Sequence, residues 1–199
     1  MPADPGSLMA WVSAGGSTFG LIFLAEMGDK SQLVCMTLAA RHRHGPVLAG
    51  AVVAFLLLNT LAVVFGAALA QWVPERLLAA LVAILFAVFG VKGLRTQAEE
   101  EDAEVPERPG HGIFFTTLLM LVLAEMGDKT QIAVAGLAST LPPLAVWLGA
   151  SLALTATSAI GVVVGTRVLR RLPMHRVHQV SGALFLLLAA LALSRALWP

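Results

Sequence analysis

Two copies of one acidic octapeptide lie inside apolar stretches of this chain. Residues 25–32 read A-E-M-G-D-K-S-Q, and residues 124–131 repeat them with threonine in place of serine. On a translocon-type scale an ionised residue at the centre of a membrane helix costs roughly 2.5–3.5 kcal/mol, and a leucine-like residue returns only about 0.3–0.6 kcal/mol. Two carboxylates and a lysine therefore cancel most of what one helix gains from lipid. We expect the two segments to face each other or a water-filled cavity, where intramembrane charges serve function.

The composition of the chain indicates a membrane protein. Of the 199 residues 58% are hydrophobic and only 13% are charged, whereas a soluble domain of this size carries about 25% charge. The net charge of +1 leaves no basic surface for nucleic acid. The sequence contains no Walker motif, so we expect no nucleotide as a partner. The single cysteine, Cys35, excludes an internal disulfide.

Six stretches are long enough to cross the hydrocarbon core, which takes ~20 apolar residues per helix. We predict an all-α polytopic membrane protein with six transmembrane helices in two three-helix repeats, residues 1–95 and 111–199. The acidic segment between them, residues 96–110, is typical of a solvated cytoplasmic linker, with a cation-collecting or regulatory loop as the alternative. The expected spans cover residues 17–40, 46–70, 76–95, 112–138, 143–166 and 175–197.

Lysine and arginine set the expected orientation, because cytoplasmic loops are enriched in them. Nine of these residues lie in or beside the loops after the first, third and fifth spans, and only Arg76 and Arg195 lie on the opposite side. We expect both termini to face away from the cytoplasm. The alanine-rich composition, together with a first segment that lacks the features of a targeting peptide, favours a bacterial inner membrane.

The similarity between the two halves extends beyond the octapeptide. At the same offset of 99 residues, Gly50 corresponds to Gly149 and Phe86 to Phe185. Each half contains an odd number of expected spans, so the second half must enter the membrane from the opposite side. Inverted repeats of this kind recur in secondary transporters, which bind their substrate near the midplane where the repeats meet.

The acidic residues of both octapeptides are the leading candidates for binding a transported cation: Glu26, Asp29, Glu125 and Asp128. Within a helix, each glutamate and aspartate would share one face and the lysine would lie beside the glutamate. Four carboxylates and two lysines carry a formal charge of −2, which one divalent cation neutralises. Protons compete with that cation for the same oxygens, which gives a mechanism for exchange.

The neighbours of these carboxylates narrow the choice of ion. Hydroxyl and amide oxygens suit Ca²⁺, Mg²⁺ or Mn²⁺. The motif contains no histidine or cysteine, which argues against Zn²⁺ or Cu⁺. The methionines are either soft ligands that favour Mn²⁺ or helix-packing residues. The glycines permit close helix approach or a local break. The lysines either tune exchange by pairing with the glutamates or only offset a buried acid. These supporting residues are Ser31, Thr130, Gln32, Gln131, Met27, Met126, Gly28, Gly127, Lys30 and Lys129.

Asn59 and Ser158 correspond to each other at the 99-residue offset and fall within the second and fifth expected spans. They could line the transport pathway or complete the coordination shell. Hydrogen bonding between helices is the alternative role for both.

The doubled signature E-x-G-D-K-[ST], in a six-span chain with an acidic central segment, resembles the Gdt family. Its members are Mn²⁺/Ca²⁺ transporters of Golgi, chloroplast and bacterial membranes, distantly related to the lysine-exporter superfamily. The resemblance implies cation/proton antiport without a prosthetic group, with the transported Mn²⁺ or Ca²⁺ bound at the site. It also implies that Glu26, Asp29, Glu125 and Asp128 bind the cation, followed by Ser31 and Thr130.

Two other classes of function fit part of the sequence. An exporter of a cationic organic solute, such as a basic amino acid, would also use carboxylates at the midplane. An intramembrane enzyme with paired acids is disfavoured, because aspartyl chemistry needs two close aspartates and each motif supplies one glutamate and one aspartate. We therefore predict a secondary active transporter and not an enzyme. It exchanges Mn²⁺, Ca²⁺ or both for protons by alternating access and exports the metal from the cytoplasm.

Overall fold

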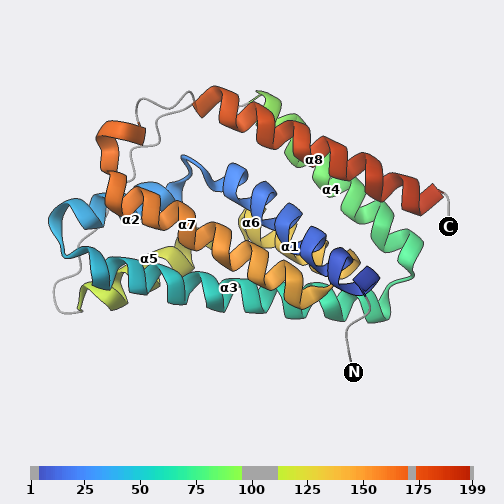
Figure 1. Ribbon diagram of the computed structural model, residues 1–199, viewed down its shortest axis with the longest axis horizontal. Helices are drawn as coiled ribbons and strands as arrows, with labels where there is room; N and C mark the ends of the chain where they lie inside the picture. Colours follow the sequence, from blue (N-terminus) through green and yellow to red (C-terminus); the bar gives the residue numbers. More distant parts are fainter. Residues whose placement is uncertain (1–4, 96–111, 170–173, 198–199) are drawn as a thin grey trace.

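The computed structural model describes residues 5–95, 112–169 and 174–197, and every regular element within them is an α-helix (Figure 1). The acidic segment expected at residues 96–110 lies outside the described residues. The helices are α1 (Pro5–Glu26), α2 (Lys30–Arg41), α3 (His44–Trp72), α4 (Glu75–Arg95), α5 (Ile113–Glu125), α6 (Lys129–Thr140), α7 (Pro143–Leu169) and α8 (Met174–Leu197).

Five helices in the described part of the chain are long and apolar enough to cross a membrane. They are α3 and α4 over their full lengths, and parts of α1, α7 and α8. These parts are Leu8–Glu26, Pro143–Val163 and Arg176–Leu197. The helix α5 is apolar but shorter, with 13 residues. The all-helical, polytopic membrane class predicted from the sequence is therefore confirmed.

Two of the expected spans are not continuous helices. The span expected at residues 17–40 is divided into α1 and α2, and the span expected at 112–138 is divided into α5 and α6. Gly28 lies between α1 and α2, and Gly127 lies between α5 and α6. Their φ angles are 83° and 82°, in the left-handed region that glycine enters without steric cost. Of the two roles considered for these glycines, the local break is the one observed. The prediction that each glutamate and aspartate share a helix face was wrong, because the chain between them leaves the helix.

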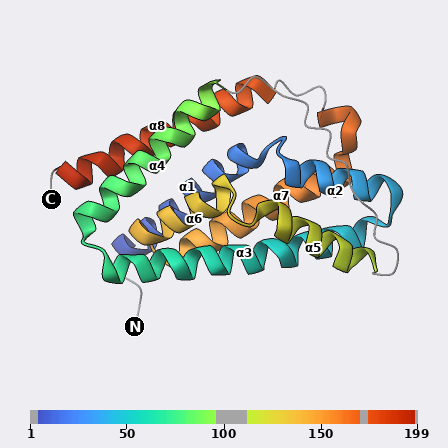
Figure 2. The ribbon, with the colours of Figure 1, turned by 180° about the vertical axis from the view of Figure 1, so that it is seen from behind.

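Three pairs of helices begin at the offset of 99 residues. The helices α2 and α6 begin 99 residues apart, as do α3 and α7, and α4 and α8. The packing follows the same correspondence: α1 packs on α7 as α5 packs on α3, and α2 packs on α7 as α6 packs on α3. Figure 2 shows α5 and α6 following the length of α3. The two motifs therefore occupy equivalent places in the two halves.

The remaining pair, α4 and α8, runs side by side along one flank of the molecule in both views (Figures 1 and 2). Their backbones come close at Gly90 and Gly93 on α4 and Gly182 on α8. A Cβ added to Gly93 would lie 3.0 Å from the Cα atom of Gly182, and one added to Gly90 would lie 2.9 Å from the carbonyl oxygen of Gly182. The ring of Phe185 on α8 contacts Phe86 and Phe89 on α4, with both centroid distances 5.7 Å. The chain enters α1 and leaves α8 at the same end of the molecule (Figure 1).

Candidate cation-binding site

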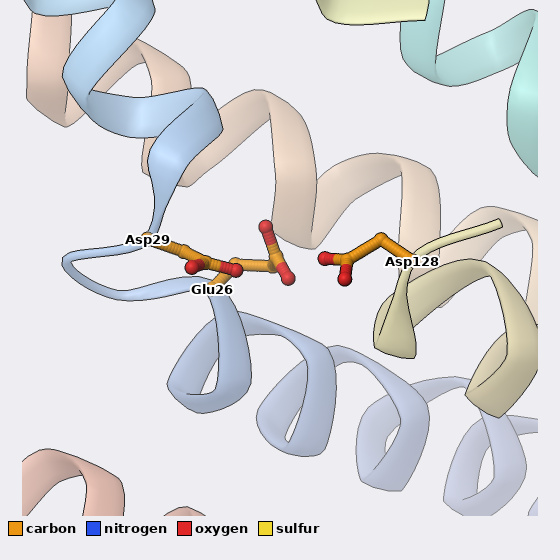
Figure 3. A group of neighbouring side chains, drawn as sticks. All are labelled: Glu26, Asp29 and Asp128. Atoms are coloured by element: carbon orange, nitrogen blue, oxygen red, sulfur yellow. The ribbon is translucent and has the colours of Figure 1, made fainter. Parts of the chain in front are cut away.

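The two helix breaks bring three carboxylates together. Glu26 is the last residue of α1, and Asp29 and Asp128 immediately precede α2 and α6. Each offers one oxygen to a group in which the oxygens all lie within 4.8 Å of one another. Figure 3 shows the three side chains pointing toward a common centre from both halves of the chain. Oxygens at this spacing can surround a single cation.

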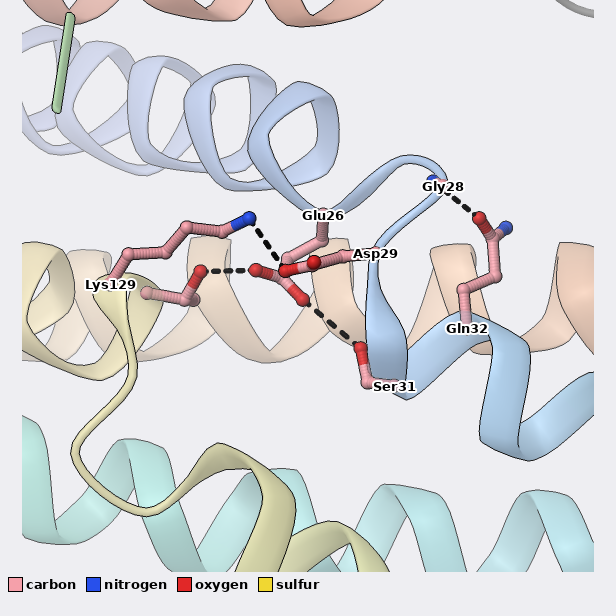
Figure 4. Close-up of polar contacts among 7 residues, drawn as sticks. Glu26, Gly28, Asp29, Ser31, Gln32 and Lys129 are labelled. Carbon is pink, nitrogen blue, oxygen red and sulfur yellow. Dashed lines mark hydrogen bonds and ion pairs between the residues drawn. The ribbon is translucent and has the colours of Figure 1, made fainter. Parts of the chain in front are cut away.

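Glu26 is the most enclosed member of this carboxylate group. Its side chain is completely buried, and its carboxylate accepts hydrogen bonds from two hydroxyls (Figure 4). Ser31 Oγ donates to Oε2 at 3.1 Å, and Thr130 Oγ1 of the other half donates to Oε1. The two hydroxyls predicted to accompany the acids therefore meet at the same glutamate.

A lysine crosses between the halves to the same group. Lys129 Nζ lies 2.6 Å from Asp29 Oδ2, with the two side chains 35% and 18% exposed (Figure 4). In a continuous helix Lys129 would lie beside Glu125, which is one of the two roles predicted for it. The structure gives it an aspartate of the other motif as partner, because the break redirects α6. Lys30 is exposed at the start of α2.

Glu125, the fourth predicted acid, is not a member of the group of three. It is buried as the last residue of α5 and lies within electrostatic range of Glu26, Asp29 and Asp128. The four predicted acids thus share one region, although only Glu26, Asp29 and Asp128 among these four have oxygens that all lie within 4.8 Å of one another.

The two glutamines of the motifs contact the breaks themselves. Gln32 Oε1 accepts a hydrogen bond from the backbone N–H of Gly28 at 2.7 Å, and Gln131 Oε1 accepts one from Gly127 at 2.6 Å. Gln32 Nε2 also donates to the carbonyl of Thr157 on α7 at 3.0 Å. Both amide oxygens, predicted as possible cation ligands, accept hydrogen bonds from the backbone in this structure.

The methionines of the motifs have different surroundings. Met27 is buried and packs with Met36 in a small apolar cluster, and its sulfur lies 3.9 Å from Gln32 Nε2. Met126 is exposed.

Asn59 and Ser158 are both buried, on α3 and α7. Asn59 Nδ2 donates to Ser151 Oγ at 3.1 Å and so joins α3 to α7. Of the two roles considered for Asn59, hydrogen bonding between helices is the one seen, and neither residue lines the cavity described next.

A cavity of about 350 Å³ adjoins the carboxylates. Asp29 and Asp128 line it with both motif lysines, whereas the buried Glu26 lies behind them. The opposite wall comes from α4 and α8 and includes Phe89, Lys92, His178, Ser181 and Phe185. Sequence reasoning did not place these residues at the site. Two polar residues within otherwise apolar stretches, Lys92 and Ser181, were the available signals.

Carboxylates gathered on broken helices of a membrane protein, beside a cavity lined in part by charged residues, are features of cation transporters. Comparison with known proteins gives the family. The family model described as "Divalent cation/proton antiporter GDT1" matches residues 14–101 and 113–198. The chain therefore belongs to the GDT1 family of divalent cation/proton antiporters, which are transporters and not enzymes.

Individual relatives cover most of the chain. The GDT1-like protein sll0615 of Synechocystis sp. is 33% identical over 193 residues, which are 86% of this chain and 92% of that protein. GDT1-like protein 3 of Arabidopsis thaliana is 28% identical over 195 residues, with 85% of this chain and 67% of that protein covered. The protein named "Putative manganese exporter" of Vibrio cholerae is 28% identical over 171 residues, with 84% of each chain covered. No solved structure matches the chain.

Proposed function

We propose that this antiporter exchanges Mn²⁺, Ca²⁺ or both for protons and exports the metal from the cytoplasm. The observation that carries the proposal is the group of three carboxylates contributed by both halves. Glu26, Asp29 and Asp128 would bind the metal directly, with Glu125 and the hydroxyls of Ser31 and Thr130 completing the site. Carboxylate and hydroxyl oxygens are hard ligands that suit both ions. The name of the Vibrio relative supports Mn²⁺ as one substrate.

The proposed exchange follows from the charges of the site. Four carboxylates and two lysines carry −2, so one divalent cation or two protons produce a neutral site. An empty site would carry an uncompensated charge through the low-dielectric interior, which is costly. The neutral loaded forms would therefore move between the two sides, and the empty form would not. Alternating access of the two halves around this site gives antiport.

The proposed topology has six crossings, formed by two inverted three-helix repeats at residues 1–95 and 111–199. The broken pairs α1–α2 and α5–α6 each serve as one interrupted span, as in transporters whose discontinuous helices bind ions. The excess of lysine and arginine in alternate loops supports a cytoplasmic linker at 96–110 and two non-cytoplasmic termini. We further propose a bacterial inner membrane as the location.

The test is ion flux in proteoliposomes with a Mn²⁺- or Ca²⁺-sensitive dye and a pH dye inside. We expect metal movement in one direction to drive protons in the other, and Glu26→Gln and Asp128→Asn to abolish both signals. Glu75→Gln is the matched control, because Glu75 is an exposed acid at the start of α4, away from the site. A wild-type protein that moves neither ion, or site variants that transport like Glu75→Gln, would refute the proposal.

A second candidate is export of a cationic organic solute, such as a basic amino acid. It is favoured by the size of the cavity, about 350 Å³, and by the rings of Phe89 and Phe185 in its wall. These surfaces could pack an aliphatic chain whose ammonium group meets Asp29 or Asp128. Radiolabelled lysine and arginine in the same proteoliposomes separate the candidates, since only an organic-cation exporter would accumulate them.

A further inference from the structure

The residues that follow each break have the sequence of a capping box. Asp29-Lys30-Ser31-Gln32 and Asp128-Lys129-Thr130-Gln131 place an aspartate before the first turn and a glutamine three residues later. In a capping box the first side chain accepts a hydrogen bond from the third backbone N–H of the helix. The glutamine reaches back to the N–H of the capping residue. Aspartate is among the preferred capping residues because its carboxylate can accept such a bond.

Both motifs depart from this arrangement in the same way. Asp29 and Asp128 hold the capping position with extended backbone, with ψ angles of 172° and 168°, but neither side chain makes a capping hydrogen bond. The glutamines instead reach one residue further back, to the glycine N–H at 2.7 Å and 2.6 Å. Each glutamine therefore satisfies a donor of the break, and each aspartate turns toward the other carboxylates (Figures 3 and 4).

We infer that Gln32 and Gln131 are positioning residues that keep Asp29 and Asp128 available for the transported cation. This inference rests on the proposed function of the carboxylate group. Each amide oxygen holds the N–H of its glycine in the left-handed turn, which fixes the direction in which the aspartate leaves the break. Without the amide, the aspartate side chain can fold back onto the first N–H groups of its own helix, as a capping aspartate normally does. Its carboxylate then leaves the cation site.

The two glutamines do not have equal surroundings. Gln32 is 1% exposed and also donates to the carbonyl of Thr157, so it ties the first break to α7. Gln131 is only partly buried. A substitution of Gln131 therefore tests the hydrogen bond to the glycine with little disturbance of the packing between helices. A substitution of Gln32 also removes the hydrogen bond between α2 and α7.

The test compares Gln131→Met, which has similar volume but no amide oxygen, with Gln131→Glu, which retains an acceptor at the same place. Mn²⁺ binding to the purified full-length protein in detergent is measured by calorimetry, with thermal unfolding as a second readout. We expect Gln131→Met to weaken Mn²⁺ binding about 10-fold or more, the usual effect of losing a residue that orients a metal ligand. Gln131→Glu should bind at least as tightly as wild type, and the metal-free unfolding temperature of Gln131→Met should change little.

A double-mutant cycle with Asp128→Asn separates positioning from direct ligation. If Gln131 acts through Asp128, Asp128→Asn in the Gln131→Met background causes little further loss, because the carboxylate has already left the site. If Gln131 is itself a ligand, the two losses multiply, which overturns the inference. Gln131→Asn, whose shorter amide does not reach Gly127, replaces Gln131→Met in the cycle if the methionine variant does not fold.

The outcomes also distinguish this inference from the proposed function. A wild-type protein that binds neither Mn²⁺ nor Ca²⁺ overturns both. Wild-type binding that is lost in Asp128→Asn but unchanged in Gln131→Met overturns the positioning role alone. Equal weakening by Gln131→Met and Gln131→Glu has the same consequence, because the acceptor oxygen would then be irrelevant.

Discussion

The break at Gly28 and the break at Gly127 have almost the same sequence but different surroundings. Met27 beside the first glycine is 7% exposed, whereas Met126 beside the second is 60% exposed. At the first break, Gln32 donates a hydrogen bond to α7. The glutamate of this break, Glu26, accepts hydrogen bonds from hydroxyls of both halves. The octapeptide therefore determines the shape of the break, and the helices packed against it determine how deeply each acid is enclosed.

The largest expected difference between the two breaks is at their glutamates. We expect Glu26→Gln to weaken Mn²⁺ binding about 100-fold, or about 2.7 kcal/mol, because Glu26 belongs to the group of three oxygens and accepts two hydroxyl hydrogen bonds. Glu125→Gln should weaken binding less, since Glu125 is outside that group. Calorimetry on both variants makes the comparison. Equal losses would mean that the two halves contribute equally to the bound state.

The pH dependence of binding sharpens the same comparison. Metal ligands must be deprotonated, so Mn²⁺ binding should weaken as pH falls, by about tenfold per pH unit for each proton displaced. The slope of log Kd against pH then counts the protons exchanged. We expect Glu26→Gln to lower the slope more than Glu125→Gln does. A slope that neither variant changes would place the exchanged protons elsewhere in the protein.

The left-handed turns allow a test of stability at both breaks. A Cβ added to Gly127 meets nothing within 4 Å, so Gly127→Ala should cost only the backbone strain of a left-handed alanine, roughly 1–2 kcal/mol. Gly28→Ala should cost more, because the same strain disturbs the buried contacts of Gln32. Thermal unfolding in detergent measures both.

The control for the turn variants is Gly20→Ala. Gly20 lies within α1 and an added Cβ there also meets nothing within 4 Å, so alanine should stabilise the helix by roughly 0.5–1 kcal/mol. A lower unfolding temperature for Gly20→Ala, or an unchanged one for Gly127→Ala, would contradict the assignment of strain to the turn.

The lysines should differ in a smaller way. Lys129 pairs with Asp29 at 2.6 Å, so Lys129→Gln removes a cation that competes with the metal for that carboxylate. We expect tighter Mn²⁺ binding, by about fivefold, or ~1 kcal/mol, the upper value for a partly exposed ion pair. Lys30→Gln should change binding less, because Lys30 is exposed. Weaker binding in Lys129→Gln would mean that the lysine instead orients Asp29.

The sequence predicted the membrane class and pointed to the three carboxylates that gather. Both signals are local, since they are the cost of charge in lipid and an octapeptide repeated at seven of eight positions. The sequence did not predict how the acids meet. The apolar stretches around the motifs predict one continuous helix each. Only the positive φ angles of Gly28 and Gly127 in the structure reveal the breaks. The pairing of Lys129 with Asp29 depends on the packing of distant helices, as does the wall supplied by α4 and α8. No pattern within either segment carries that information.

The smallest expected effect concerns the join between the halves. Asn59 on α3 donates to Ser151 on α7 at 3.1 Å, and both side chains are buried. Hydrogen bonds between membrane helices contribute about 0.6 kcal/mol on average, so Asn59→Ala should lower the unfolding temperature slightly and leave Mn²⁺ binding unchanged. A clear loss of binding would instead place Asn59 in the transport pathway, and the same measurement on Ser151→Ala would show whether it acts through this bond. Because the bond joins α3 to α7, faster or slower flux with unchanged binding would show that it restrains the movement of one half against the other.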